Sequence, residues 1–384
     1  MKQIARNTFI GTLALLLGAC NQAEHLEGGE EVPIAFHTRV VSEGSQASGE
    51  SARLLFWSDA DFHEKWIIGN GVGLKPRYTV LLDKEINHYT HESKIYYQTP
   101  YTYPYNFEKI HATGYAPDYA LTPADTQGGY TELAVNEEYQ IGNTDLLTCD
   151  GRLSHSASMN PENIFLRKEK ELQFRHLTAK LSFYGTRHPD MYGLVGVRNI
   201  RITIHNPAGD KQLVVPTRLK LYNYDDADDK QKDYSTYIAS ETTPYPDGSK
   251  FVHTPIIAAY DTPELGTCYV LSDGIEYGTE DGQFEPIEGK WKGDFRNPHP
   301  SLKITIEAEL YNAEQGSGAE SSVQAKWEKE VTDWKESYTG DMFLPGYEYK
   351  VTLQFDRLGI ALRAEAVPWN SEELHEYPVH PITE

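Results

Sequence analysis

Hydrophobic and polar residues alternate with a period of two from Gly346 to Asn370, close to the C-terminus of the chain. Large apolar side chains recur at every second position on both sides of a turn-like segment, Asp356 to Gly359. Successive side chains of a strand point to opposite faces of a sheet, so this period indicates strands with one buried face. The stretch therefore predicts a β-hairpin, and its alternating apolar positions are Tyr347, Tyr349, Val351, Leu353, Phe355, Ile360, Leu362, Ala364 and Ala366.

The same alternation predicts further strands, above all in NIRITIHNP and SLKITIEAELY. In LQFRHLTAKLSFYG the apolar phase changes at His176-Leu177, which is the signature of a β-bulge. Helical periodicity is weak and confined to 59–66 and 322–334. These patterns predict an all-β chain whose antiparallel sheets pack as sandwiches.

The length of 384 residues favours two domains. A charged KEKE run near Glu169 to Glu171 separates two regions of patterned strands. We therefore expect a leader over 1–19, an N-terminal β-sandwich domain over 20–170 and a C-terminal β-sandwich domain over 171–384.

The charge balance restricts the class of partner. The chain has 35 basic and 57 acidic residues, a formal net charge of −22. A nucleic-acid binder needs a basic face to offset phosphate charge, so this balance argues against nucleic acid as a partner. A mutually repelling surface protein fits it better.

The first twenty residues predict export and lipidation. Lys2 and Arg6 precede the apolar run FIGTLALLL, which is too short to cross a bilayer. Leu17-Gly18-Ala19-Cys20 then resembles a bacterial lipobox, in which the thiol of Cys20 accepts an acyl glycerol. The alternative is a plain secretory signal with an incidental cysteine. Cys149 and Cys268 could pair in an oxidising compartment, or remain separate thiols.

The chain offers little that indicates catalysis. The acidic run from Tyr222 to Tyr234 lacks the glycine and closing glutamate of a calcium loop, and we expect a solvated hairpin tip there. His176 is expected to be a packed histidine bonded to the backbone. The nucleophile, zinc, redox and phosphate-binding motifs HExxH, GxSxG, CxxC and GxxxxGK[ST] are absent from the sequence. We expect no enzyme activity, no catalytic or metal-binding residues and no cofactor.

Several segments together resemble the fimbrillin-type subunits of Bacteroidetes, the family of major fimbrial subunits and Mfa-like adhesins. They are the lipobox at Cys20, IHATGYAP, YTELAVNEEYQIGNTDLLTCDG, LQFRHLTAKLSF, and LPGYEYKVTLQF followed by GIALRAEAVPW. The set runs through most of the mature chain in order. The resemblance implies two transthyretin-like sandwich domains in tandem and no catalysis.

The resemblance also implies an assembly mechanism. A lipidated precursor is displayed on the outer membrane, and a protease cuts it after an arginine. Loss of the first strand leaves an apolar groove, which the C-terminal strands of a neighbouring subunit fill by β-augmentation. Such a head-to-tail contact does not close, so it builds a fimbrium from many subunits. The surface that the fimbrium would bind, on a host or on bacteria, is not indicated.

The residues that would carry this mechanism can be named. Within 32–53, Val32, Ile34 and Phe36 would form the removable strand, and the cut would follow Arg53 or Arg39; either arginine could equally be an ordinary surface charge. The donor strand would be supplied by Tyr349, Val351, Leu353, Phe355, Ile360 and Leu362. The same six residues could instead complete the subunit's own C-terminal sandwich.

Two regions depart from the family pattern, 187–294 and the proline-containing tail after Trp369. They leave open whether the chain is a stalk subunit, a tip adhesin or an anchor. The alternative functions are a monomeric surface lipoprotein that binds glycan or protein through exposed aromatic residues, and an exported hydrolase of unrecognised type.

Overall fold

The structure is a computed structural model of the chain. It describes residues 33–40, 51–58, 78–81, 86–87, 92–93, 96–102, 109–124, 132–154, 171–206, 212–223, 235–248, 250–253, 257, 261–275, 277–280, 283–286, 300–316, 318, 321–334, 342–357 and 359–368. Nearly all elements in these ranges are strands, so the all-β prediction is confirmed.

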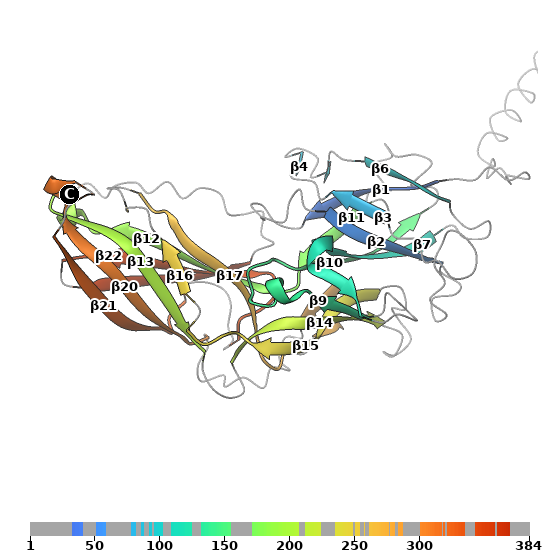
Figure 1. Cartoon of the computed structure of the whole chain (residues 1–384). Coiled ribbons are helices and arrows are strands. Elements are labelled where there is room, and N and C mark those ends of the chain that lie inside the picture. Colours follow the sequence, from blue (N-terminus) through green and yellow to red (C-terminus); the bar gives the residue numbers. More distant parts are fainter. Residues whose placement is uncertain are drawn as a thin grey trace, which may run out of the picture.

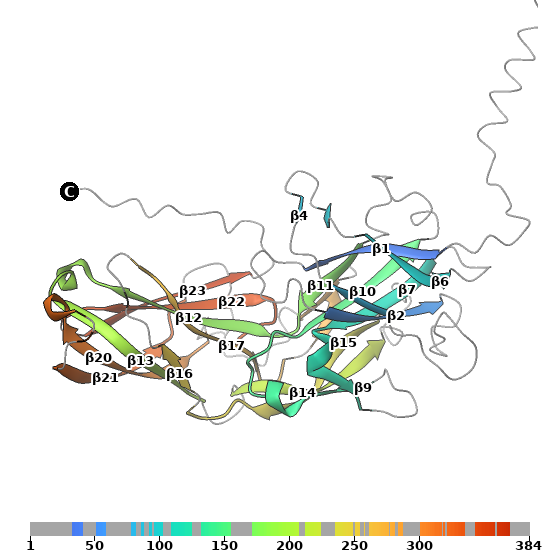
Figure 2. The same ribbon diagram turned by 45° about the horizontal axis from the view of Figure 1, so that its top comes forward.

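One sheet has seven strands, most of them from the N-terminal part of the chain (Figures 1 and 2). In spatial order they are β3 (Tyr78–Leu81), β2 (Ser51–Ser58), β7 (Lys109–Ala116), β10 (Leu147–Ser154), β11 (Glu171–His176), β1 (Pro33–Val40) and β6 (Tyr96–Thr102). The first described strand, β1, therefore lies inside this sheet and not at its edge.

A second sheet has eight strands and runs the length of the molecule. Its order is β23 (Ile360–Pro368), β22 (Tyr347–Phe355), β12 (Ala179–Arg187), β17 (Glu264–Ser272), β14 (Leu213–Asn223), β9 (Glu132–Val135) and β8 (Leu121–Pro123), and β15 (Ser235–Pro244) pairs with β14. The β22–β23 hairpin matches the one predicted, with Phe355 opposite Ile360 across the turn.

A third sheet has the order β16 (Lys250–His253), β13 (Val195–His205), β20 (Leu302–Asn312) and β21 (Ser322–Val331). The remaining elements are short: the pairs β4 (Ile86–Asn87) with β5 (Glu92–Ser93) and β18 (Tyr277–Glu280) with β19 (Gln283–Pro286), and the single 3-10 turns η1 (Asp118–Ala120), η2 (Glu137–Tyr139), η4 (Pro189–Met191) and η6 (Ala313–Gln315).

The seven-stranded sheet is strongly curled. Phe36 on β1 and Phe56 on β2 are four strand spacings apart in the sheet order, which would separate them by about 19 Å in a flat sheet. Their ring centroids nevertheless lie 5.8 Å apart. The sheet therefore rolls around the side chains of its concave face. Gly114 on β7 fits this crowding, because a Cβ atom there would lie 2.5 Å from Leu54 Cδ2.

The convex face of this sheet packs against part of the eight-stranded sheet. Leu55 and Tyr115 belong to the same buried cluster as Leu219 and Tyr237. The rings of Tyr115 and Tyr237 meet edge to face, with centroids 5.7 Å apart. This is a favoured geometry for aromatic pairs in a core.

The other end of the molecule is a sandwich, in which β12, β17, β22 and β23 face the four-stranded sheet. Its core is the largest buried cluster and includes Phe183, Ile202, Ile304, Val351 and Phe355. Figure 1 shows this sandwich at the left and the curled sheet at the right. We call it the C-terminal sandwich.

Strand β14 belongs to both ends. Its first residues, Leu213 and Val215, are buried in the C-terminal sandwich, whereas Leu219 is buried beneath the curled sheet. The division between residues 170 and 171 stays a prediction, and the sheets run across it. Strand β11 joins β10 and β1, and β14 pairs with β9.

Two predictions about local structure were wrong. The phase change at His176-Leu177 is not a β-bulge: β11 ends at His176 and β12 begins at Ala179, and the two strands belong to different sheets. The second wrong prediction is the weak helix expected over 322–334. Residues Ser322–Val331 instead form strand β21, which pairs with β20 along its whole length. The alternation in VQAKWEKEV outweighs the helical propensity of its Lys, Glu and Ala residues.

Candidate strand-exchange site

Strand β1 is hydrogen-bonded on both of its edges. It runs parallel to β11 from His37↔Glu171 to Val40↔Phe174. It also runs antiparallel to β6, where Phe36 faces Tyr97. If β1 left the sheet, β11 and β6 would each lose a hydrogen-bonded neighbour, and a gap as wide as one strand would open between them.

Two side chains of β1, those of Ile34 and Phe36, contribute to the buried core of the curled sheet. Ile34 and Phe36 are fully buried, as are Leu172 and Phe174 on the neighbouring β11. Burial of a large apolar side chain contributes about 1.5–3 kcal/mol, so removal of β1 would uncover a costly apolar groove. Val32, the third residue predicted for this strand, lies outside the described residues.

Both candidate cleavage arginines lie in strands. Arg39 is in β1, opposite Gln173 of β11. Arg53 is in β2, opposite Thr79 of β3 and Tyr115 of β7. The segment 41–50 between the two strands lies outside the described residues. A protease needs an extended chain free of its neighbours, so a cut at either arginine requires local opening of the strand that contains it.

Arg53 has a partner that the sequence did not reveal. Its Nε lies 3.0 Å from Oδ2 of Asp118, and the hydroxyl of Ser51 donates to the same carboxylate. Asp118 lies in η1, directly after the IHATGYAP segment. The ion pair ties the start of β2 to that turn, and no sequence spacing links the two residues.

The predicted donor residues lie in the C-terminal sandwich of their own chain. The four on β22 are fully buried, Ile360 is 5% exposed, and Leu362 packs on the same cluster while half-buried. The hydroxyl of Tyr349 donates to the carbonyl of Met342 and accepts from the amide of Leu344. In this state, therefore, the six residues complete their own subunit's core.

The two strands of the hairpin differ in their neighbours. Strand β22 lies between β12 and β23, while β23 has β22 as its one neighbour among the described strands. Release of β23 would break one ladder, and release of β22 would break two. The donor assignment stays a prediction, and β23 is the strand that can leave at lower cost.

The opposite face of this hairpin contains a buried polar group. Glu348 lies 3.0 Å from Nζ of Lys180, accepts a hydrogen bond from Ser182, and has Lys350 at 3.4 Å. Burial alone would raise the pKa of Glu348, but the two ammonium groups and the hydrogen bonds outweigh it and lower that pKa. Burial also raises the pKa of the neighbouring Tyr184 to about 12.

The residues considered for metal or redox chemistry are all packed. His176 is a packed histidine, as expected: it is buried and its Nδ1 lies 2.9 Å from Oδ2 of Asp145. Cys149 and Cys268 are both buried and are not joined in a disulfide, and burial raises the pKa of Cys268 to about 12. Among the described residues, no group of His, Cys, Asp and Glu side chains has the arrangement of a metal site.

Two further sequence-predicted features fall outside the described residues. One is Cys20, the predicted lipidation site, and the other is the acidic stretch 224–234. The strands that flank this stretch, β14 and β15, do pair in antiparallel fashion, with Asn223 opposite Ser235. In the described part of the chain, no helix has the length and apolar character needed to span a membrane.

No protein-family model and no curated protein sequence matches the chain. Solved structures do match it in shape. A fimbrial protein from Bacteroides vulgatus is 11% identical, with a TM-score of 0.39 over 87% of this chain and 99% of its own. The tip fimbrial protein Mfa3 from Porphyromonas gingivalis is 9% identical, with a TM-score of 0.35 over 88% of this chain and 100% of its own.

A fimbrilin from Porphyromonas gingivalis gives a similar result. It is 9% identical, with a TM-score of 0.37 over 88% of this chain and 98% of its own. These neighbours in shape are fimbrial proteins from Bacteroidetes.

Proposed function

We propose that this chain is the lipid-anchored precursor of a fimbrial subunit or tip adhesin, assembled by proteolysis-triggered strand exchange. Acylated Cys20 would hold the precursor at the outer membrane. A cut after Arg53 or Arg39 would release β1, and a strand from a sibling chain would take its place. The role of the resulting fimbrium would be cell adhesion, without catalysis.

The position of β1 is the observation that supports this proposal most directly. The first described strand of the chain is an interior strand of the curled sheet, with Ile34 and Phe36 fully buried. A chain built to stay monomeric could keep its terminal strand at a sheet edge, where its loss would cost little. Here the loss of β1 leaves a gap of one strand between two partners, which a second strand can fill by β-augmentation.

The energetics favour β23 as the segment that fills the gap. Ile360 and Leu362 would leave the core of their own subunit. The free energy gained by burying them in the neighbouring subunit is therefore offset by the burial lost in their own. The net gain in apolar burial then comes from the acceptor groove, because its side chains are exposed while it is empty and become buried when the donor strand enters. An edge strand with one ladder to break is the segment for which this balance is most favourable.

Limited cleavage with an arginine-specific protease tests the proposal. We expect the purified chain to lose a fragment ending at Arg39 or Arg53 and then to form a ladder of oligomers that resist dilution. Arg53→Ala and Arg39→Ala identify the cut. The matched control is Arg201→Ala, which removes an exposed arginine from β13, outside the proposed donor and acceptor strands.

The alternative outcomes are distinct. A chain that is cut and remains monomeric contradicts strand exchange. An uncut monomer that binds polysaccharide tightly would support the glycan-binding lipoprotein instead. Leu362→Asp tests the donor role of β23 separately from cleavage. It should block polymerisation while leaving cleavage at the arginine unchanged.

A further inference from the structure

Strand β21 forms a long, regular edge of the C-terminal sandwich, and its charged side chains restrict which strands can pair with it. It is ten residues long, pairs with β20 without a bulge, and contains no proline. Among the described strands it has no neighbour on its other side. Long regular edges of this kind can pair with another strand unless charge or shape prevents it. Figures 1 and 2 show it as the outermost strand of its sheet.

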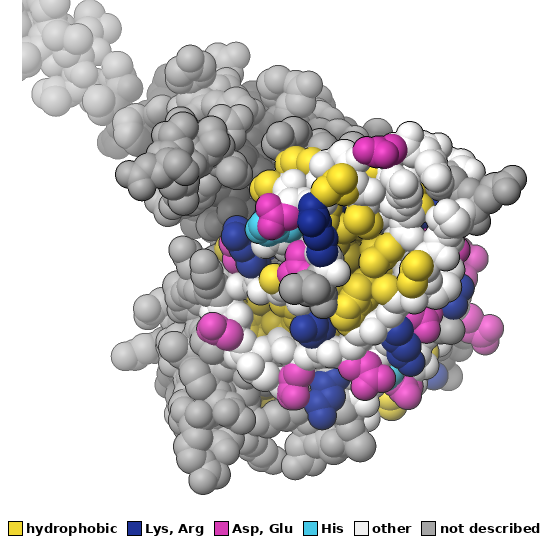
Figure 3. Space-filling view, turned by 90° about the vertical axis from the view of Figure 1, so that its left-hand side faces the viewer, with side chains coloured by type: hydrophobic (Ala, Val, Ile, Leu, Met, Phe, Trp, Pro, Cys, Tyr) yellow, Lys and Arg dark blue, Asp and Glu magenta, His cyan; other side chains and the backbone are white. Residues whose placement is uncertain are grey.

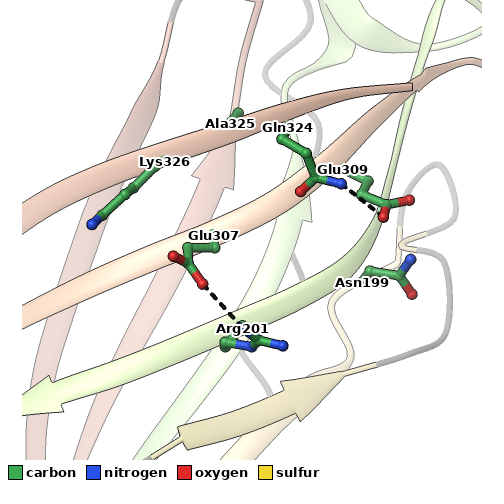
Figure 4. A pocket seen from close by; sticks show the side chains of 7 residues that line it. All are labelled: Asn199, Arg201, Glu307, Glu309, Gln324, Ala325 and Lys326. Atoms are coloured by element: carbon green, nitrogen blue, oxygen red, sulfur yellow. Dashed lines mark hydrogen bonds and ion pairs between the residues drawn. The ribbon is translucent and has the colours of Figure 1, made fainter. Parts of the chain in front are cut away.

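Charges alternate across the outer face of this sheet. Arg201 on β13 lies opposite Glu307 on β20, which lies opposite Lys326 on β21. Figure 4 shows Arg201 and Glu307 joined across the two strands, and their side chains are 3.4 Å apart. Across the three strands, the charges in this row of side chains are positive, negative and positive, and the row ends with Lys326 at the edge of the sheet. A further strand would continue the alternation if it placed a carboxylate opposite Lys326.

The neighbouring row ends with the complementary charge. Glu328 lies opposite Thr305 on β20, so the outer end of that row is negative. Glu328 is exposed, and Lys326 of the same strand lies 3.9 Å from it. The edge of β21 therefore presents a positive charge followed two residues later by a negative one. In an antiparallel pair of two such strands, the positive charge of each strand can therefore lie opposite the negative charge of the other.

We propose that the partner of β21 is β21 of a second copy, paired antiparallel with the two-fold axis through Trp327. In that register each Lys326 faces the partner's Glu328, giving two identical cross-strand ion pairs. The two four-stranded sheets would join into one sheet of twice the width. This contact is isologous and closes as a dimer, so it is separate from the head-to-tail contact of strand exchange.

Charge selects this register over its neighbours. When two copies of a strand pair about a two-fold axis that passes through a residue, each side chain stays on its own face of the sheet. The possible registers therefore differ in the residue through which this axis passes. An axis through Lys326 would oppose two ammonium groups, and an axis through Glu328 would oppose two carboxylates. The axis through Trp327 opposes unlike charges at both sites.

Apolar side chains agree with the same register. Val323 points toward the interior side of its sheet, opposite Leu310, yet is 68% exposed. The pairing would place it opposite the partner's Val331. Figure 3 shows hydrophobic side chains gathered on this end of the molecule, among acidic and basic ones.

Reciprocal charge reversal tests the proposal on the uncut full chain, with Cys20→Ser to prevent acylation. We expect sedimentation equilibrium to show a monomer–dimer equilibrium that weakens with added salt. Lys326→Glu and Glu328→Lys should each raise the dissociation constant roughly ten- to thirtyfold, because two attractive pairs become repulsive. The double variant Lys326→Glu/Glu328→Lys should restore dimerisation, since it recreates two unlike pairs.

The controls address charge and folding. Lys220→Glu alters the net charge by the same amount at an exposed position of β14, and it should leave the dimer intact. Loss of dimer through misfolding would persist in the double variant, because the glutamate introduced at position 326 still lies opposite Glu307. A wild-type chain that is monomeric up to its solubility limit overturns the proposal. So does a double variant as weak as the single ones.

Discussion

At the residue scale, the structure changes the meaning of polar positions on the closing hairpin. Glu348 and Lys350 occupy the polar phase of the period-two pattern, which by itself indicates exposure to solvent. Glu348 is 5% exposed, however, and Lys180 beside it is 8% exposed. Buried ions of opposite charge are tolerated when each supplies the other's partner, and removal of one leaves the other uncompensated.

Substitution Glu348→Gln is therefore expected to destabilise the chain. We expect the free energy of unfolding at pH 7 to fall by about 2–4 kcal/mol, because Lys180 would keep a buried charge without its carboxylate. Glu307→Gln, which removes one member of an exposed ion pair, is the matched control and should cost less than about 1 kcal/mol. Urea unfolding of both variants gives the comparison, and equal losses would contradict this account.

The pH dependence has a definite sign. The folded-state pKa of Glu348 is lowered, so its contribution is present above the unfolded value of about 4.3 and is lost as the pH falls through the folded value. The penalty of Glu348→Gln should accordingly be largest near neutral pH and shrink on acidification below about pH 4. A penalty that does not change with pH would assign the effect to packing alone.

At the scale of elements, β1 carries the proposed function. Its side chains lie against residues distant in sequence, and the Phe36–Phe56 contact closes the curled sheet. Such a strand should matter as much to stability as any core strand while it is in place. Its proposed removal then has a consequence that can be measured as lost folding free energy.

We expect Phe36→Ala to lower the free energy of unfolding by about 3–5 kcal/mol, the usual cost of emptying a buried phenylalanine site. Leu194→Ala truncates an apolar side chain that is 46% exposed and should have a much smaller effect. Denaturant unfolding of the uncut chain measures both. A loss in Phe36→Ala as small as in the control would show that β1 is not held in the sheet.

At the scale of the whole molecule, the two ends share a sheet. Strand β14 contributes Leu213 and Val215 to one core and Leu219 to the other. A strand that spans two cores transmits loss of packing from one to the other, so the ends should unfold together and not as separate units.

Leu219→Ala tests this coupling, because its side chain touches the cluster beneath the curled sheet. We expect hydrogen exchange to rise in β20 of the C-terminal sandwich as well as in β2 and β7. Faster exchange confined to β2, β7 and β9 would show instead that the two ends open independently. Leu310→Ala, in the C-terminal sandwich, provides the reciprocal comparison.

The alternation of apolar and polar residues determined the strands themselves, including the closing hairpin, because that pattern records which face of a strand is buried. It also carried the all-β class and the identity of Ile34 and Phe36 as buried positions. Only the tertiary structure decided which strands are neighbours. The slot between β11 and β6 and the partner of Arg53 at Asp118 depend on contacts between residues far apart in the chain. Local periodicity contains no information on such contacts, since their free energy arises only when distant segments pack together.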